Sequence, residues 1–165
     1  MTPPAPVGRP AALGCEVLDT ATWWTQLLSD VSDASEVSVS TLLYDHQGLT
    51  GILLRKLRLG NFKVEVVVDR EACEAQPPVA PRQAPRLRAL CEAGAEVLLA
   101  RGVGRLGRLH GKALVCDRRV AYCGCANFTD KSSANSELCL RLRGPPVADV
   151  LKFVIDAKKN ARLLG

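Results

Sequence analysis

The chain has 165 residues, of which 47% are hydrophobic, and it carries a net charge of +5. A chain of this length can form one domain with a hydrophobic core, but it is too short for two domains that each have a core of their own. No apolar run approaches the roughly 18 residues that a membrane span needs, so we expect no transmembrane segment. The small positive excess allows an anionic partner, either nucleic acid or anionic phospholipid, but does not choose between them.

The first residues differ from the rest of the chain in composition. Four of the ten prolines lie between positions 3 and 10, with one arginine and no apolar core. Such a segment matches neither a signal peptide nor a transit peptide. We therefore predict a flexible lead-in over residues 1–14, followed by one domain over residues 15–165.

The seven cysteines are odd in number and irregularly spaced, and no C-x-x-C pair occurs. This pattern argues against a zinc ribbon. Cys123 and Cys125 alternate on a predicted strand, where neighbours rarely form a disulfide. We expect reduced, mostly buried cysteines in an intracellular protein, with the cytoplasm favoured and mitochondrial association left open.

The first half of the chain alternates between helical and extended patterns. Asp19 or Thr20 can cap a helix in which apolar residues, including Trp24, recur at helical spacing, and the tryptophans are predicted to be core residues. Alternating or apolar runs mark strands, and Gly60-Asn61 ends an amphipathic helix. The predicted order is a helix from residue 20, a strand at 35–43, a helix at 47–59 and a strand at 62–68. This order favours parallel pairing in an α/β sheet.

The second half begins with a proline-rich segment over residues 70–85, which we predict to be a loop. The elements predicted after it are a helix at 85–94, a strand at 95–100, a glycine- and arginine-rich loop at 101–108, strands at 112–116, 120–124 and 137–142, and a closing helix from Pro145. We therefore predict an α/β fold with a mixed, largely parallel sheet flanked by helices.

The residues with clear chemical potential lie between 108 and 137. His110, Lys112 and Asp117 fall in the spacing H-x-K-x4-D, and Gly124-Cys125-Ala126-Asn127 and then Glu137 follow. On a strand, residues two apart share a face, so the histidine and the lysine should lie side by side. An imidazole nucleophile beside a fixed cation suits attack on a phosphodiester, because negative charge develops on the phosphorus-bound oxygens.

This stretch resembles the signature of the phospholipase D superfamily, H-x-K-x4-D-x6-G-S-x-N, with every spacing kept and Cys125 in place of the serine. Asn127-Phe128-Thr129 is similar to the Asn-Trp-Thr of single-motif members. The resemblance implies a phospholipase D-like domain and a phosphodiesterase that works through a covalent phosphohistidine. It also implies that neither a metal nor another cofactor is needed.

The resemblance also implies roles for individual residues. His110 would be the nucleophile, Lys112 and Asn127 would bind the non-bridging phosphate oxygens, and Glu137 would orient a histidine of the site. Asp117 would have a supporting role in the catalytic set. The substrate-binding residues expected beside these are Cys125, whose thiol is a weaker donor than serine and should slow turnover, and the loop arginines Arg105 and Arg108.

One motif supplies only half of what this chemistry needs, because a second histidine must protonate the leaving oxygen. His46 is the only other histidine and lies outside any motif. The resemblance therefore implies a homodimer in which each subunit gives one His110 to a shared site.

Three functions stay open at this point. The first is an endonuclease on single-stranded nucleic acid, like the bacterial single-motif members, with the arginines and Lys131 near the motif following the phosphate backbone. The second is a phospholipase D or cardiolipin hydrolase, as in the mitochondrial relatives. The third is a weakly active phosphate-binding protein, suggested by Cys125. Aromatic residues make up only 4% of the chain, which argues against sequence-specific reading of bases.

Overall fold

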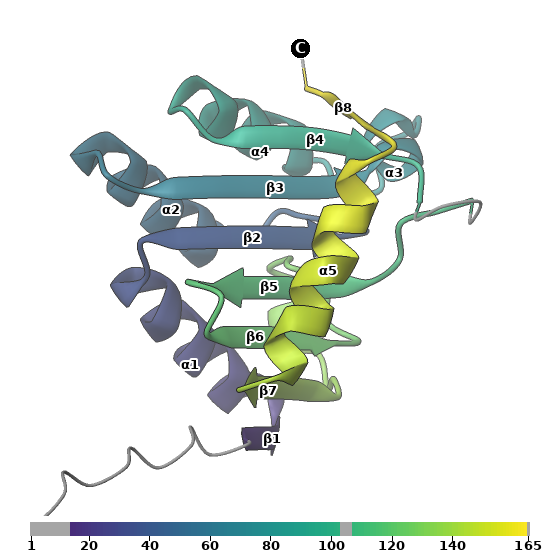
Figure 1. Ribbon diagram of the computed structural model, residues 1–165. Helices are drawn as coiled ribbons and strands as arrows, with labels where there is room; N and C mark the ends of the chain where they lie inside the picture. Colours follow the sequence, from purple (N-terminus) through teal and green to yellow (C-terminus); the bar gives the residue numbers. More distant parts are fainter. Residues whose placement is uncertain (1–13, 103–106, 165) are drawn as a thin grey trace, which may run out of the picture.

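The computed structural model describes residues 14–102 and 107–164. These residues form one eight-stranded sheet with the order β1-β7-β6-β5-β2-β3-β4-β8. The strands are β1 (Gly14–Leu18), β2 (Glu36–Thr41), β3 (Lys63–Asp69), β4 (Glu96–Ala100), β5 (Lys112–Cys116), β6 (Val120–Gly124), β7 (Cys139–Arg143) and β8 (Ala161–Leu163). Figure 1 shows β1 and β8 at the two ends of the sheet.

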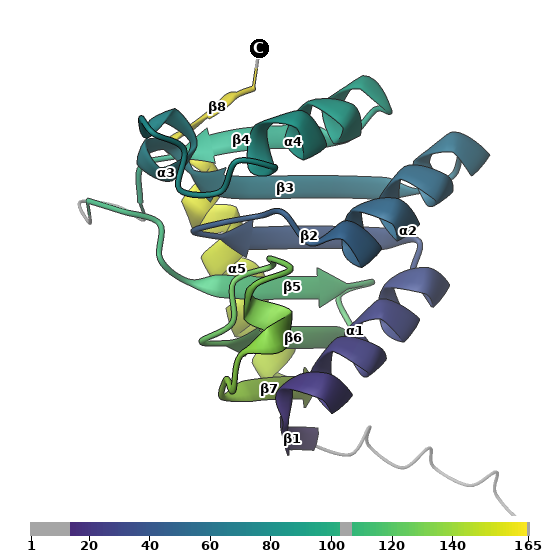
Figure 2. The same ribbon diagram turned by 180° about the vertical axis from the view of Figure 1, so that it is seen from behind.

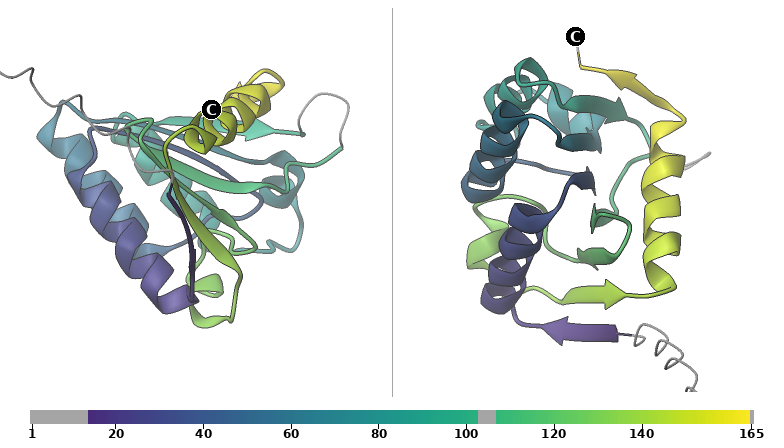
Figure 3. Two further views of the ribbon diagram at one scale, coloured as in Figure 1. Left: turned by 60° about the horizontal axis from the view of Figure 1, so that its bottom comes forward. Right: turned by 60° about the vertical axis from the view of Figure 1, so that its left-hand side comes forward.

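Helices cover both faces of this sheet. They are α1 (Thr20–Asp33), α2 (Gln47–Leu59), α3 (Arg70–Glu74), α4 (Gln83–Glu92) and α5 (Pro146–Lys158), and a single 3-10 turn spans Ser132–Ala134. Helix α5 crosses one face alone, whereas α1, α2 and α4 lie on the other (Figure 2). The views in Figure 3 show the resulting helix–sheet–helix layers, and the predicted α/β class is confirmed.

The sheet is mixed, but parallel pairing is limited to its centre. Strand β3 pairs in parallel with β2 and with β4, as the alternation of helices and strands predicts. The other five neighbouring pairs are antiparallel. The expectation of a largely parallel sheet was therefore wrong, because the hairpin of β5 and β6 and the strands at both ends add antiparallel partners.

The main core lies between the sheet and helices α1, α2 and α4. Trp23 and Trp24 are 1% and 5% exposed, which confirms that they are core residues. The Trp23 ring stacks on Phe128 with centroids 5.9 Å apart, and Tyr122 meets Trp23 edge to face. Aromatic pairs of this kind contribute beyond the area they bury. They join helix α1 to the segment that follows β6.

The strand register decides which residues meet at each edge of the sheet. Lys112 at the start of β5 lies opposite Gly124 at the end of β6, and Gly124 lies opposite Cys139 at the start of β7. The carboxyl ends of β2, β3 and β4 lie at the same edge, because these three strands are parallel and Ser40, near the end of β2, pairs with Ala113, near the start of β5. We call this side of the sheet the His110 edge; it contains the residues just before β5, just after β6 and just before β7.

Several details differ from the expectations. Strands β1 and β8 were not predicted, α3 lies within the segment expected to be a loop, and α4 begins at Gln83. All seven cysteines are free, but only Cys116 and Cys139 are buried, so the expectation of mostly buried thiols was wrong. No helix among the described residues is long and apolar enough to cross a membrane.

Candidate active site

His110 and Lys112 meet at the His110 edge, as their spacing predicts. The Lys112 ammonium nitrogen lies 2.9 Å from Nδ1 of His110 and 3.5 Å from Nε2. The imidazole is exposed, whereas Lys112 is only 8% exposed. Burial lowers the pKa of Lys112, and the nearby Cys125 and Glu137 partly oppose this shift. An exposed imidazole therefore contacts an ammonium group that is largely shielded from water.

Gly111 explains why these two side chains share one side. A Cβ atom at this position would lie 2.4 Å from Cζ of Phe153, a residue of α5. Helix α5 thus packs directly on the backbone of residue 111. The neighbours Leu109 and Ala113 face the same small core beneath α5, whereas Leu114 faces the main core. Alternation along the chain then directs residues 110 and 112 away from α5.

The segment before His110 is held by Asp69, a residue to which the sequence analysis gave no role. This carboxylate at the end of β3 is fully buried. It accepts hydrogen bonds from the backbone N–H of Leu109 at 3.0 Å and of Ala72 at 2.8 Å. The sequence could have pointed to Asp69 through its place at the end of a buried parallel strand, because binding sites of α/β sheets often lie at the carboxyl ends of such strands. Asp69 fixes the backbone one residue before the imidazole.

The same carboxylate changes the interpretation of Arg108. The guanidinium of Arg108 lies 2.8 Å from Asp69 and 3.5 Å from Glu71, and Asp69 raises its pKa. Arg108 is therefore paired within the chain, and this position does not favour the predicted contact with substrate. Arg105 lies outside the described residues. Arg101 and Lys131 are exposed cations near the His110 edge.

The backbone after β6 approaches the next strand closely at Gly124. A Cβ here would lie 2.2 Å from the carbonyl oxygen of Leu138 and 3.1 Å from Cα of Cys139. The N–H of Cys125 donates to that same Leu138 oxygen at 3.0 Å. The glycine thus lets the chain bring Cys125, whose thiol is exposed, to the His110 edge.

Gly124→Ala should therefore destabilise the protein by about 2–4 kcal/mol, because the methyl group meets backbone that cannot move aside. Gly51→Ala is the matched control, since a Cβ there meets nothing within 4 Å. In the middle of α2 that change should stabilise by about 0.5–1 kcal/mol. Urea unfolding of both variants measures the difference. Equal stability for the two would contradict the close approach at Gly124.

Asn127 is fixed by the end of β2. Its Oδ1 accepts hydrogen bonds from the backbone N–H of Leu43 at 3.3 Å and from Oγ1 of Thr41 at 3.4 Å. Because the carbonyl oxygen is engaged, the amide nitrogen is the free end of the side chain, and it has no hydrogen-bond partner among the described residues. An amide N–H₂ provides two donors, which suits phosphate oxygens.

Glu137 reaches the same edge but does not bond to His110 within the described part of the chain. Its backbone N–H donates to Oγ1 of Thr20 at 3.0 Å, and its carboxylate accepts a long contact of 3.5 Å from Asn135. Its charge favours the protonated form of Lys112 and so partly opposes the lowering of the Lys112 pKa by burial. The hydrogen bond that the resemblance implies between Glu137 and a histidine is therefore not formed inside one chain.

Asp117 lies at the opposite edge of the sheet. It follows the end of β5, roughly 17 Å from Lys112 at 3.3 Å per residue. Its Oδ1 accepts hydrogen bonds at 2.9 Å from the backbone N–H groups of Ser35 and Glu36 and from the Ser35 hydroxyl. This position corrects the expectation that Asp117 belongs to the catalytic set. The aspartate joins the turn between β5 and β6 to the start of β2, and Arg118 and Arg119 share this distant edge.

Asp117→Asn should lower stability by about 1–3 kcal/mol, because three donors lose a charged acceptor, and should leave the rate per folded molecule unchanged. Burial raises the pKa of Asp117, but the Ser35 and Glu36 bonds outweigh it, so the pKa lies below its ordinary 3.8. The stabilisation is therefore complete above that value and is lost as the pH falls below it. Unfolding measured against pH tests this, and a variant with native stability and no activity would return Asp117 to the catalytic set.

His46, the second histidine of the chain, has a structural position. Its Nδ1 accepts a hydrogen bond from the Leu49 N–H at 3.0 Å and so caps helix α2. The ring stacks on Trp24 with centroids 4.0 Å apart. Burial lowers the pKa of His46, which favours the neutral ring. It is therefore a poor candidate for the proton donor of the reaction.

A family model described as the phospholipase D-like domain of cardiolipin synthase matches residues 26–157. The chain belongs to the phospholipase D-like family. The match begins within α1, continues through nearly all of α5 and includes the His110 edge.

Solved structures show the same fold for this phospholipase D-like protein. Nuc from Salmonella typhimurium, a phospholipase D family member, is 15% identical with a TM-score of 0.77, over 93% of this chain and 99% of that one. NucT from Helicobacter pylori is 15% identical with a TM-score of 0.79, over 93% and 100%. A phosphatidylserine synthase from Haemophilus influenzae is 20% identical with a TM-score of 0.70, over 96% and 41%. A search of curated proteins finds no match.

Proposed function

We propose that this protein is a phosphodiesterase that cleaves single-stranded nucleic acid through a covalent phosphohistidine at His110, without a metal ion. The observation that carries this proposal is the contact of 2.9 Å between the Lys112 ammonium and the exposed imidazole. The register of β5, β6 and β7 supports it, because the thiol of Cys125 and the amide of Asn127 reach the same edge. The cations of the chain there take the part that a metal ion plays in other phosphodiesterases.

The reaction begins when the Lys112 ammonium leaves its contact with His110 and binds the phosphate of the substrate instead. A charged ammonium can only donate, so the ring nitrogen beside it holds a lone pair. An incoming phosphodiester offers stronger anionic acceptors to Lys112 and Asn127. The freed lone pair then attacks phosphorus as the bond to the leaving oxygen breaks, and that oxygen takes a proton from a second imidazole. Water later attacks the phosphohistidine, gives its proton to the second imidazole and releases His110.

The second imidazole comes from a second copy of the chain in this proposal. His46 caps α2 with Nδ1 and stacks on Trp24, so another His110 is the remaining source. Two copies that place their His110 edges together would bring two lysines and two amides to one phosphate. The Glu137 carboxylate could then accept from an N–H of the partner's imidazole the hydrogen bond that it lacks within one chain.

Subunit mixing tests the shared site. Adding excess His110→Ala protein to wild type should inhibit activity, because mixed dimers retain one nucleophile but lose the proton donor. Sedimentation at the assay concentration should show a dimer. A monomer with full activity on dilution would contradict the shared site.

A phospholipid is the second candidate substrate, favoured by the name of the matching family model and by the likeness to a phosphatidylserine synthase. The exposed Leu138, 60% accessible beside Cys125, could contact acyl chains. Assays with EDTA present, on a single-stranded oligonucleotide and on cardiolipin vesicles, separate the two candidates. Cleavage of the oligonucleotide alone is the predicted result. Cleavage of cardiolipin alone would favour the second candidate.

Cys125→Ser should raise the turnover rate about two- to tenfold, because a hydroxyl is a better donor to phosphate than a thiol. The exposed Cys91 provides the matched control, and Cys91→Ser should leave the rate unchanged. Single-turnover rates of the three proteins decide the matter. A lower rate for the Cys125 variant would mean that the thiol is no handicap, and an inactive wild type that serine does not rescue would favour a phosphate-binding protein.

A further inference from the structure

The loop that carries Asn127 is bound to the chain after β2 through backbone atoms. The carbonyl oxygen of Phe128 accepts hydrogen bonds from the N–H groups of Asp45 and His46 at 2.9 and 3.0 Å. The Phe128 ring is fully buried against Trp23. These contacts anchor residue 128, but one anchored residue does not set the rotation of the loop around it.

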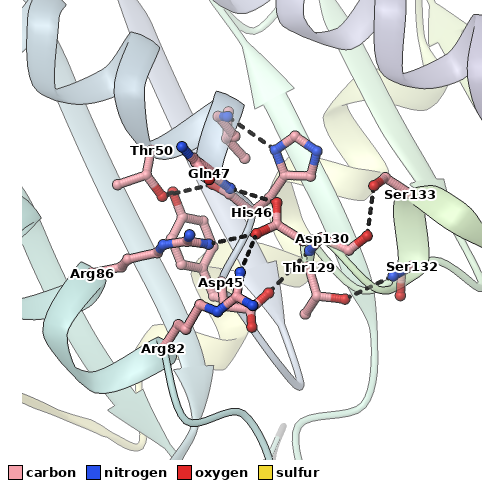
Figure 4. A network of polar contacts seen from close by, with 12 residues as sticks. Asp45, His46, Gln47, Thr50, Arg82, Arg86, Thr129, Asp130, Ser132 and Ser133 are labelled. Atoms are coloured by element: carbon pink, nitrogen blue, oxygen red, sulfur yellow. Dashed lines mark hydrogen bonds and ion pairs between the residues drawn. The ribbon is translucent and has the colours of Figure 1, made fainter.

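Asp130 supplies a second point of attachment, two residues further on (Figure 4). Its backbone N–H donates to Asp45 at 3.0 Å, and its Oδ1 accepts from the Gln47 N–H at 2.8 Å. Gln47 is the first residue of α2, where N–H groups lack partners within the helix. The carboxylate thus binds the positive end of α2 from outside the helix.

The other carboxylate oxygen of Asp130 reaches helix α4. Oδ2 lies 3.0 Å from Nη1 of Arg86 and 3.4 Å from Nη1 of Arg82. The Arg86 side chain is only 17% exposed and the Asp130 side chain 34% exposed, so this pair is better shielded than an ordinary surface ion pair. Burial alone would raise the pKa of Asp130, but the Gln47 bond and Arg86 lower it, which keeps the carboxylate charged. Asp130 therefore joins the loop to two helices at once.

The bonds that orient Asn127 are sensitive to the position of this loop. Its two contacts with Leu43 and Thr41 measure 3.3 and 3.4 Å, which is longer than typical hydrogen bonds of these kinds. A small shift of the loop would break them and free the amide to rotate. Phe128 and Asp130 lie one and three residues beyond Asn127, so together they fix both the place and the rotation of the loop.

We infer that Asp130, held by Arg86 and the N-terminus of α2, is a positioning residue that aims the Asn127 amide at the reacting phosphate. This inference rests on the proposed function, in which Asn127 binds a non-bridging oxygen. Asp130 itself does not touch the substrate. Its effect passes through Asn127, so its loss changes the rate only while that amide is present.

A double-mutant cycle tests the inference. Asp130→Asn keeps the shape of the side chain but loses the pair with Arg86, and we expect kcat to fall on the order of tenfold with little change in KM. Arg86→Met removes the same pair from the other side and should give a similar loss. In an Asn127→Ala background, Asp130→Asn should cause no further fall. Asp156→Asn is the matched control, because Asp156 on α5 pairs with Lys152 of the same helix and with Lys159 just beyond its end, and its loss should not affect the rate.

The outcomes separate this inference from the proposed function. Equal losses from Asp130→Asn with and without the Asn127 amide, or no loss at all, would overturn the positioning role. If wild type cleaves no phosphodiester, the proposed function fails, and nuclear magnetic resonance of the Asn127 side-chain amide still decides the inference. The amide signals should shift in Asp130→Asn and stay in place in Asp156→Asn. Unchanged signals in Asp130→Asn would overturn it, even if the variant is less stable.

Discussion

His110→Ala should abolish phosphodiester cleavage, with a fall in rate of about 10⁴-fold or more, as is typical when a covalent nucleophile is removed. The imidazole at the His110 edge is exposed and contacts Lys112. No other described histidine is placed to replace it, because the ring of His46 is buried as a helix cap. The measurement is the rate of oligonucleotide cleavage in EDTA, with thermal unfolding to show that the variant is folded.

The other histidine of the chain provides the control. Asparagine is a good residue at a helix N-terminus, so His46→Asn should keep the cap on α2 while removing the imidazole. Its rate per folded molecule should stay within a few-fold of wild type, although the lost stacking on Trp24 should lower its stability. An active His110→Ala protein beside an inactive His46→Asn protein would reverse the assignment of the nucleophile.

Lys112→Met should lower the rate by about 10²–10³-fold, because the developing negative charge loses a fixed donor. Methionine keeps much of the length and the apolar part of the side chain and removes the charged N–H donors, so the fold should be retained. Lys159→Met is the control, since Lys159 is an exposed lysine paired with Asp156 on α5. A loss that is equal in the two variants would mean that the charge at position 112 has no special part in the reaction.

The lowered pKa of Lys112 gives this role a pH signature. Burial moves the pKa below its ordinary 10.5, so kcat/KM should fall as the pH rises through the lowered value. A bound phosphate stabilises the ammonium, so the alkaline fall in kcat should lie at higher pH. Lys112→Arg should move the fall in kcat/KM upward, because a guanidinium stays charged. For stability the sign is opposite: the unfolded lysine holds its proton more tightly, so stability rises with pH through the folded pKa.

Strong local patterns predicted much of the fold. The helix at 47–59 and the strands at 112–116 and 120–124 have the bounds expected from their apolar spacing and turn residues. The short edge strands β1 and β8 carry no such pattern, since much of their surface is exposed. Helix α3 is five residues long and begins after a cap at Asp69. This helix was missed because the proline-rich sequence that follows it favoured the prediction of a loop.

In the candidate site too, local sequence patterns predicted some contacts, whereas contacts between distant residues were missed. The contact between His110 and Lys112 follows from a spacing of two on an extended segment, which needs no knowledge of distant residues. Asp69 and Leu43 are distant in sequence from the residues they hold, and Asp130 is distant from Gln47 and Arg86, which hold it. Only the folded chain brings these groups together. Asp117 was assigned to the catalytic set through the family resemblance. Its place after a five-residue strand puts it at the opposite edge, where it binds backbone amides.

The phosphohistidine is the most direct test of the proposed chemistry. Wild-type protein quenched with alkali during turnover of an oligonucleotide in EDTA can be digested and analysed by mass spectrometry, since phosphohistidine survives base. We predict that the peptide containing His110 carries the phosphate together with the oligonucleotide fragment that is still esterified to it, and that the His110→Ala protein carries no such adduct. Rapid cleavage without any adduct, or an adduct on Cys125 instead, would contradict the account.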